Sequence, residues 1–296
     1  MKGHYIVKIN SRCNANCCFC ADSREIRSNE DFEHDKLIKD LEKNRKKFDS
    51  LIISGGEPTI YKKLFEYIKY AKHRCKYKHI TLTTNGFMLA YSNFTDKLIE
   101  CGVDSFIISF ATSDEKMYDA IYKVKGAFRH VDKAISNIKK RNKGIRINSV
   151  VHKLNYKNLA NTVSYLIDKN VDSIQLSFMN PVGSSMVNGK SAIALPFKEI
   201  MPYVKDAFKV AEKLDFDGLF IENIPICVAR EFSNKVSDLK KPEENKDYYN
   251  YCKTKPEKCN ECIHFAVCDG VWEKYLKQFG DEELEPIKKV VMTNGI

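Results

Sequence analysis

A regular alternation of short apolar runs and longer amphipathic runs fills most of this chain. Each apolar run has the length and composition of a buried strand, and each longer run carries apolar residues at helical spacing. The predicted strands are residues 4–10, 51–54, 80–84, 104–110, 145–151 and 173–178. The predicted helices are residues 33–48, 62–72, 94–101, 127–141, 156–170 and 197–214. Because strands that alternate with helices pair in parallel, the pattern predicts one parallel sheet covered by helices.

The number of strand–helix units predicts the shape of this sheet. Eight units close a full barrel, whereas this chain has only six. We therefore expect an α/β fold, a partial (β/α)6 TIM-like barrel in residues 1–215, with a small cysteine-rich C-terminal extension in residues 216–296. Residues 233–250 are charged and polar, and we expect a linker or surface loop there.

Composition indicates an ordinary globular chain. It has 296 residues, of which 43% are hydrophobic, and no apolar run approaches the roughly 18 residues of a membrane-spanning helix. Residues 1–25 show a strand pattern rather than a signal peptide, so we expect a cytoplasmic protein without a membrane partner. The formal net charge of +10 is spread over helix-like segments in which lysines are mixed with acids, which argues against a nucleic-acid partner.

Three cysteines stand directly after the first predicted strand, at C-x3-C-x2-C spacing. They are Cys13, Cys17 and Cys20. A 4Fe-4S cluster normally takes four cysteine ligands, so three would leave one iron open to another ligand. Two other interpretations stay open: a structural zinc site, which requires further ligands nearby, and buried or disulfide-bonded cysteines, which suit a secreted chain. Cys18 is an extra thiol that we predict to pack.

Loops after the other predicted strands carry groups that can bind a ligand, because the carboxyl ends of parallel strands share one edge of the sheet. The second strand is followed by Gly55-Gly56-Glu57-Pro58, in which two glycines allow close backbone approach and Glu57 can accept hydrogen bonds. Such a turn is also a common tight connection between a strand and a helix. The further candidates are Thr84, Asn85, Ser109, Asn148 and residues 180–183.

These motifs together resemble the radical S-adenosylmethionine (radical SAM) superfamily. Its signature is this cysteine spacing with an aromatic residue, here Phe19, before the last cysteine. The resemblance implies that Cys13, Cys17 and Cys20 hold a 4Fe-4S cluster whose open iron binds S-adenosylmethionine (SAM). A low-potential cluster next to the bound sulfonium would then break a carbon–sulfur bond of SAM by one-electron reduction.

The resemblance also implies which residues contact SAM. The Gly55-Gly56-Glu57 turn would hold its amino group, Ser109 and Asn148 would contact its ribose and methionyl carboxylate, and residues 178–183 would surround its adenine. Phe19, Thr84 and Asn85 complete the predicted cofactor-binding set. Relatives often carry Ser-x-Asp in the fourth strand, whereas Ser109-Phe110-Ala111 has no acid there. We expect a side chain at Gly56 to weaken SAM binding more than cluster assembly.

A second cysteine group, Cys259-x2-Cys262-x5-Cys268, has the spacing of an iron–sulfur or zinc site that needs a fourth ligand. The candidates are Cys227, which follows Pro225-Ile226, and Cys252. The run resembles the C-terminal extension called SPASM or, in its one-cluster form, Twitch. A full SPASM pattern has another cysteine where this chain has Trp272, so the resemblance implies one auxiliary 4Fe-4S cluster and favours Cys227 as the fourth ligand.

The chain has seven histidines, and only His264 lies within a cysteine group. His264 therefore keeps a place among the candidates for a functional role. The other six, His152 among them, show no ligand spacing, and we predict that they are structural or solvated.

The resemblance implies an enzyme. We expect a radical SAM enzyme that reductively cleaves SAM to a 5′-deoxyadenosyl radical and removes a hydrogen atom from a peptide or protein, as a maturase does. The alternative within the family is a dehydrogenase or epimerase of a small alcohol or sugar. An electron donor such as flavodoxin or ferredoxin would be a partner. The rival from another class is a non-catalytic zinc-binding interaction module.

Overall fold

The computed structural model describes residues 3–21, 30–237 and 252–288. In these ranges seven parallel strands form one sheet in the order β1-β2-β3-β4-β5-β6-β9. The strands are β1 His4–Lys8, β2 Ser50–Ser54, β3 His79–Thr84, β4 Ser105–Ser109, β5 Gly144–Val151, β6 Ser173–Phe178 and β9 Leu219–Glu222. Every neighbouring pair is parallel, so the carboxyl ends of all these strands lie at one edge. The predicted α/β fold, a partial TIM-like barrel, is confirmed.

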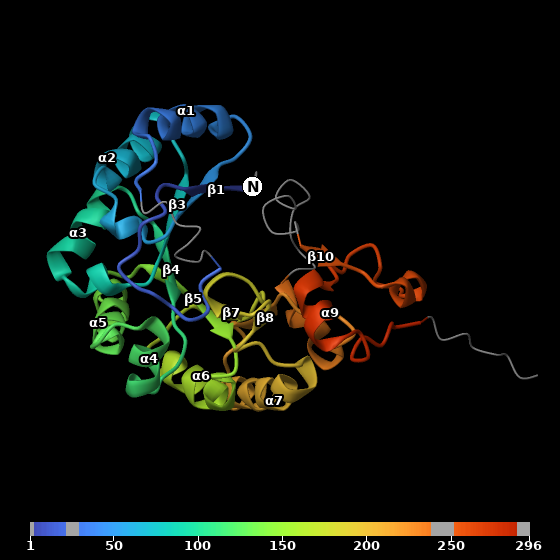
Figure 1. The fold of residues 1–296 in the computed structure, drawn as a ribbon. Helices are drawn as coiled ribbons and strands as arrows, with labels where there is room; N and C mark the ends of the chain where they lie inside the picture. The colour runs from blue at the N-terminus through green and yellow to red at the C-terminus, as the bar shows by residue number, and fades with distance from the viewer. Residues whose placement is uncertain (1–2, 22–29, 238–251, 289–296) are drawn as a thin grey trace, which may run out of the picture.

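Helices form an outer arc around the curved sheet, as Figure 1 shows. They are α1 His34–Arg45, α2 Leu64–Lys69, α3 Ser92–Cys101, α4 Glu115–Tyr122, α5 Ala127–Lys139, α6 Leu159–Asp168 and α7 Phe197–Lys213. Short helical segments occupy Pro58–Ile60, Tyr70–Arg74, Phe87–Ala90, Tyr156–Asn158, Gly183–Ser185, Arg230–Lys235 and Glu257–Glu261. Among the described residues, no helix is both long and apolar enough to cross a membrane.

The central strand β5 shows that the sheet has one buried face and one accessible face. Ile145, Ile147 and Val151 are fully or almost fully buried, and they alternate with Arg146 and Asn148, which stay partly exposed. Successive side chains of a strand point to opposite faces. One face of the sheet therefore packs under the helices as the core, and the concave face, which carries Asn148, stays accessible.

Helix α4 occupies residues for which the sequence predicted only a polar loop. The carboxylate of Asp114 accepts a hydrogen bond from the backbone N–H of Met117 (2.8 Å) and caps the helix. Tyr118, Ile121 and Tyr122 are buried on one side of it. A capping aspartate followed by apolar residues at helical spacing was the signal for this helix, but the surrounding polar residues obscured it.

The seventh strand, β9, was also missed. It pairs with β6 and buries Leu219 and Ile221. The strand has four residues and follows a segment in which helical periodicity fades, so pattern alone did not reveal it. The division at residue 215 stays a prediction, and β9 lies beyond it.

The C-terminal segment packs against the start of α7. Short strands β10 Lys253–Thr254 and β11 Val271–Trp272 pair antiparallel and lead into α9 Glu273–Phe279, while β7 Met186–Val187 and β8 Lys190–Ser191 form a second hairpin. Gln278 accepts a hydrogen bond from Ser191 N (2.8 Å) and donates one to Ser191 O (3.0 Å). The ring of Tyr275 stacks on that of Phe197 at 4.1 Å. These contacts place the second cysteine group beside the open side of the sheet (Figure 1).

The cap of α4 provides a test of this fold. We expect Asp114→Ala to lower the free energy of unfolding by about 1 kcal/mol, because the Met117 N–H loses its acceptor. Asp114→Asn should unfold close to the wild type, since asparagine caps helices as well as aspartate. Urea denaturation under anaerobic conditions measures both variants, and equal destabilisation by the two substitutions would contradict the assignment of the cap.

Candidate functional site

The turn after β2 contacts the residues directly before the cysteine loop, which we define as the segment 13–20 after β1. Gly56 N donates a hydrogen bond to Asn10 O (3.0 Å), and Glu57 N donates one to Arg12 O (2.7 Å). A Cβ atom on Gly56 would lie 2.2 Å from Arg12 O. The glycine thus makes room for the chain that carries the cysteine loop. The sequence predicted that a side chain at Gly56 would weaken SAM binding more than cluster assembly; this contact leads us to expect that both would weaken together.

The Glu57 carboxylate is buried, with 1% of the residue exposed, and it accepts four hydrogen bonds. Its Oε1 accepts from Thr59 N (3.0 Å), Thr59 Oγ1 (2.6 Å) and Thr84 Oγ1 (2.7 Å). Its Oε2 accepts from Asn85 N (2.7 Å). Burial raises the pKa of Glu57, whereas these hydrogen bonds act in the opposite direction. The carboxylate joins the end of β2 to the end of β3.

Asn85 extends this connection to the cysteine loop. Its Nδ2 donates a hydrogen bond to Asn14 Oδ1 (2.7 Å), and its Oδ1 accepts one from Phe87 N (3.0 Å). Thr84 Oγ1, besides donating to Glu57, accepts a hydrogen bond from Gly86 N (3.0 Å). Both predicted cofactor-binding side chains therefore bond within the protein, and the structure gives them the role of supporting the loop.

Helix α4 holds the middle of the cysteine loop. Asn16 N donates to Tyr122 O (3.1 Å), and Cys18 N donates to Ile121 O (3.0 Å). The last carbonyl groups of a helix have no partner within the helix, so they are available to fix such a loop. The ring of Phe19 also meets the edge of Tyr122, with centroids 5.7 Å apart.

The loop after β6 holds the last cysteine of the segment. Ser184 N donates a hydrogen bond to Cys20 O (2.8 Å). Gly183 adopts a φ of +62°, and a Cβ there would lie 2.2 Å from Cys20 O. Only glycine fits this conformation and this close contact at low energetic cost.

Ser109 and Asn148 are register partners on neighbouring strands β4 and β5. The hydroxyl groups of Ser109 and Tyr122 form a hydrogen bond of 2.8 Å. Both predicted residues thus lie at one level of the sheet, and Tyr122 fixes the Ser109 hydroxyl. Their contacts with a cofactor stay predictions.

The three thiols of the cysteine loop lie close together. Cys13, Cys17 and Cys20 are all half-buried. Burial, and after it the neighbouring thiols of Cys13 and Cys20, raise the pKa of Cys17. This donor set of three adjacent thiols fits a cluster with one open iron.

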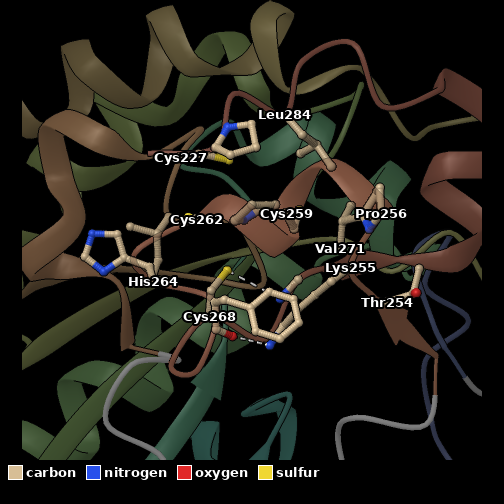
Figure 2. Close-up of a pocket in the computed structure, with 15 residues that line it drawn as sticks. Cys227, Thr254, Lys255, Pro256, Cys259, Cys262, His264, Cys268, Val271 and Leu284 are labelled. Carbon is tan, nitrogen blue, oxygen red and sulfur yellow. Dashed lines mark hydrogen bonds between the residues drawn. The ribbon is translucent and has the colours of Figure 1, made fainter. Parts of the chain in front are cut away.

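A second constellation of thiols lines a small cavity in the C-terminal segment, as Figure 2 shows. The cavity is bounded by Cys227, Cys259, Cys262 and Cys268, with Lys255 and His264 also in its wall. Burial, followed by the three other thiols, raises the pKa of Cys227 to about 11, although a backbone hydrogen bond acts in the opposite direction. The structure therefore brings together four cysteines, the first and last of which, Cys227 and Cys268, are 41 positions apart in the sequence.

Cys252 lies outside the residues that line this cavity. It is exposed, and its carbonyl accepts a hydrogen bond from Glu273 N (2.7 Å). The cavity thus contains the favoured fourth candidate, Cys227, and not the alternative. The assignment of ligands stays a prediction.

Comparison with known proteins identifies the family. Residues 7–166 match the Radical SAM superfamily. The chain belongs to this superfamily. Radical SAM membership implies a 4Fe-4S cluster and SAM, and the cysteine loop lies within the matched residues.

Sequence similarity to curated radical SAM proteins is limited in extent. A probable GTP 3′,8-cyclase of Sulfurisphaera tokodaii is 28% identical over 63% of this chain and 59% of its own length. A 7,8-dihydro-6-hydroxymethylpterin dimethyltransferase of Methanocaldococcus jannaschii is 30% identical over 45% of this chain and 27% of its own length. The chain thus spans less than two thirds of either relative.

Solved radical SAM folds match over more of the chain. The structure of anSMEcpe with bound AdoMet covers 96% of this chain and 92% of its own, with a TM-score of 0.66 and 17% identity. SuiB of Streptococcus suis covers 83% of this chain and 55% of its own, with a TM-score of 0.61 and 20% identity. At these identities the likeness shows the fold alone.

Two residues beside the radical SAM loop were missed in the sequence. Tyr122 lies on the unpredicted helix α4, so its contact with the loop could not be foreseen. His152 was predicted to be structural or solvated, and it is fully buried directly after β5; what was not foreseen is that its ring stacks on Phe19 at 5.4 Å. The rule that residues after each strand face a common edge was the available signal for His152.

Gly56 provides a test of how the loop is held. We expect Gly56→Ala to destabilise the protein by roughly 1–3 kcal/mol, because the added methyl group overlaps the backbone at Arg12. Iron content and SAM affinity should fall together, since the loop itself is displaced. Thermal unfolding, iron analysis and calorimetry with SAM measure these effects on anaerobically purified protein.

Gly144→Ala is the matched control for this substitution. A Cβ on Gly144 would make only ordinary contacts, the nearest at 3.5 Å from Ser105 Cβ. We expect its iron content to equal that of the wild type. Full iron content in Gly56→Ala with weakened SAM binding alone would restore the original expectation from the sequence.

Proposed function

We propose that this radical SAM enzyme holds two 4Fe-4S clusters. Cys13, Cys17 and Cys20 would hold the cluster that binds SAM. Cys227, Cys259, Cys262 and Cys268 would hold one auxiliary cluster in a Twitch-like extension. The observation that carries the second assignment is the arrangement of these four thiols around one cavity.

The auxiliary site offers a complete set of protein ligands. Four thiolates satisfy the usual requirement of a 4Fe-4S cluster, so none of its irons would be open to a substrate. Lys255 lies at the wall of the cavity, where its ammonium group donates to Phe265 O (2.5 Å). A cation there would partly offset the negative charge of a thiolate-bound cluster. We propose electron transfer or support of the C-terminal fold as the role of this site.

The reaction depends on how this chain positions SAM and substrate. When bound to the open iron, SAM supplies the 5′-deoxyadenosyl radical that removes a hydrogen atom. The protein's contribution is to orient the reacting atom and keep water and other hydrogen donors away. Ser109 and Asn148 stay the proposed contacts of the SAM ribose and carboxylate, on the concave face of the sheet. An electron donor such as flavodoxin or ferredoxin and a cytoplasmic location also stay predictions.

A peptide or protein is the substrate that we propose first. Structures of SuiB bound to its precursor peptide SuiA, and of anSMEcpe bound to a peptide, have this fold. The proposal rests on the near-complete overlap with anSMEcpe, which includes the C-terminal segment. A peptide maturase would place its substrate at the carboxyl ends of the strands, beside the cysteine loop.

A small-molecule substrate is the second candidate. The sequence similarity to probable GTP 3′,8-cyclases favours it. Two deuterated substrates distinguish these candidates: uniformly deuterated GTP, and a deuterated form of any short precursor peptide that is found encoded near the gene. Deuterium that appears in 5′-deoxyadenosine only with a peptide supports the maturase, whereas deuterium transfer from GTP would replace it with the cyclase.

The cysteine loop should be the source of all SAM cleavage. We expect the triple variant Cys13→Ala, Cys17→Ala, Cys20→Ala to form no 5′-deoxyadenosine under anaerobic reducing conditions, because no open iron would remain. Its auxiliary cluster should persist, visible as residual iron and a brown colour. Formation of 5′-deoxyadenosine at the wild-type rate would contradict the assignment of the SAM-binding cluster to these three cysteines.

The fourth auxiliary ligand has its own test. We expect Cys227→Ala to lose the auxiliary cluster or to leave one of its irons distinct in Mössbauer spectra, because one thiolate is missing. Cys252→Ala is the matched control and should keep the wild-type spectrum. The reverse pattern would show that Cys252, and not Cys227, completes the site.

A further inference from the structure

A hollow of about 300 Å³ lies on the concave face of the sheet, at the amino ends of the strands. Its wall includes the first residue of each of four strands, β1, β4, β5 and β6, namely His4, Ser105, Gly144 and Ser173. The cysteine loop follows the opposite, carboxyl end of β1. This amino-end hollow is therefore separate from the predicted SAM site.

The amino-end hollow exists because small polar residues occupy this level of the sheet. Thr81, Ser105 and Gly144 are register partners on β3, β4 and β5, and Arg146 pairs with Ser173 of β6. Side chains alternate between the two faces along each strand, so register partners share a face. The interior of a barrel is normally filled by bulky apolar side chains. Here three hydroxyl groups and a glycine leave that volume open.

Arg146 supplies a positive charge to the amino-end hollow. Its side chain is exposed, and no ion pair or hydrogen bond engages its guanidinium group in the described part of the chain. By contrast, Arg129 and Arg141 each pair with a carboxylate. The five N–H donors of Arg146 are therefore available to a ligand.

The other titratable residues that line the amino-end hollow do not compensate this charge. The carboxylate of Asp172 accepts a hydrogen bond from Ile145 N (2.6 Å) and pairs with Lys139 (3.3 Å). His4 is neutral at pH 7, because burial and, after it, the nearby charge of Arg146 lower its pKa from the usual value. A positive field thus remains in the hollow, and it favours a negatively charged ligand.

Hydroxyl groups add further donors beside the guanidinium group. Ser105 Oγ lies 2.8 Å from His79 Nε2 and 3.0 Å from Thr81 Oγ1, within hydrogen-bond distance of both. Ser173 stands opposite Arg146 on the neighbouring strand. A hydroxyl hydrogen rotates to suit its acceptor. An anion that accepts several hydrogen bonds therefore matches this wall better than a halide does.

We infer that the amino-end hollow binds an oxyanion, a carboxylate or phosphoryl group of a small molecule, through a bidentate contact with Arg146 and hydrogen bonds from the hydroxyl groups of Ser105 and Ser173. The planar guanidinium group matches the geometry of both oxyanions. The volume of about 300 Å³ is at the lower end of the range for ligand pockets, which suits a small molecule. The inference does not depend on the proposed function, because the hollow lies at the other end of the strands from the cysteine loop.

Modification of arginine by phenylglyoxal tests the inference on the wild-type chain. Arg74 is the internal control, because it is exposed like Arg146 but lies outside the amino-end hollow. We expect saturating inorganic phosphate or acetate to slow the modification of Arg146 about tenfold and to leave that of Arg74 unchanged, with ionic strength held constant by chloride. Peptide mass spectrometry measures both rates in one sample.

The two probes distinguish the sources of the oxyanion. Better protection by phosphate supports a phosphoryl ligand, and better protection by acetate supports a carboxylate. Protection by neither anion, or equal slowing at Arg74, would overturn the inference.

Two variants test the donors separately. We expect Arg146→Gln to weaken binding of the protecting anion about tenfold or more, and Ser173→Ala to weaken it about threefold. Arg74→Gln is the matched control, since it removes the same charge elsewhere on the surface, and it should bind the anion like the wild type. Calorimetric titration of the cluster-loaded protein measures these affinities, while iron content and thermal unfolding report whether each variant keeps its clusters and fold. Wild-type affinity in Arg146→Gln would contradict the inference.

Discussion

The buried carboxylate of Glu57 is the interaction on which the arrangement of the site depends. A charged group with 1% exposure is stable only if its oxygens are satisfied, and four donors from Thr59, Thr84 and Asn85 satisfy them. Those donors come from the ends of two neighbouring strands. The same residue donates its backbone N–H to Arg12 O. Glu57 thus binds the edge of the sheet through its side chain and the chain that carries the cysteine loop through its backbone N–H.

The cysteine loop has little regular structure of its own, so the surrounding elements must hold it. The Gly56 turn fixes its start, the carbonyl groups at the end of α4 fix its middle, and Ser184 fixes its end. Each contact is made through backbone atoms, and two of them require glycine because a Cβ atom would overlap a carbonyl oxygen. Such a loop can present three thiols in a fixed arrangement before any cluster binds.

The fold and the cysteine groups could be predicted because each produces a regular pattern in the sequence. Strand and helix periodicity identified six of the strands in the parallel sheet, and spacing identified both cysteine groups. Sequence reasoning failed at the short strand β9, which follows a segment of fading periodicity, and at α4, where polar neighbours obscured the capping signal. It did not foresee the contacts of Gly56 with Arg12 or of His152 with Phe19, because these partners are far away in sequence and adjacent only in the folded chain. The position of Cys227 beside Cys259, Cys262 and Cys268 was favoured by the resemblance to Twitch extensions. Sequence spacing alone could not have predicted it.

The central claim is that one chain holds two clusters that differ in whether an iron is open. Mössbauer spectroscopy of the 57Fe-reconstituted wild-type protein, recorded with and without SAM, tests it most directly. The account predicts about eight irons per chain in two 4Fe-4S clusters, with SAM altering one iron of one cluster only. About four irons per chain, or about two zinc ions and no iron, would contradict it.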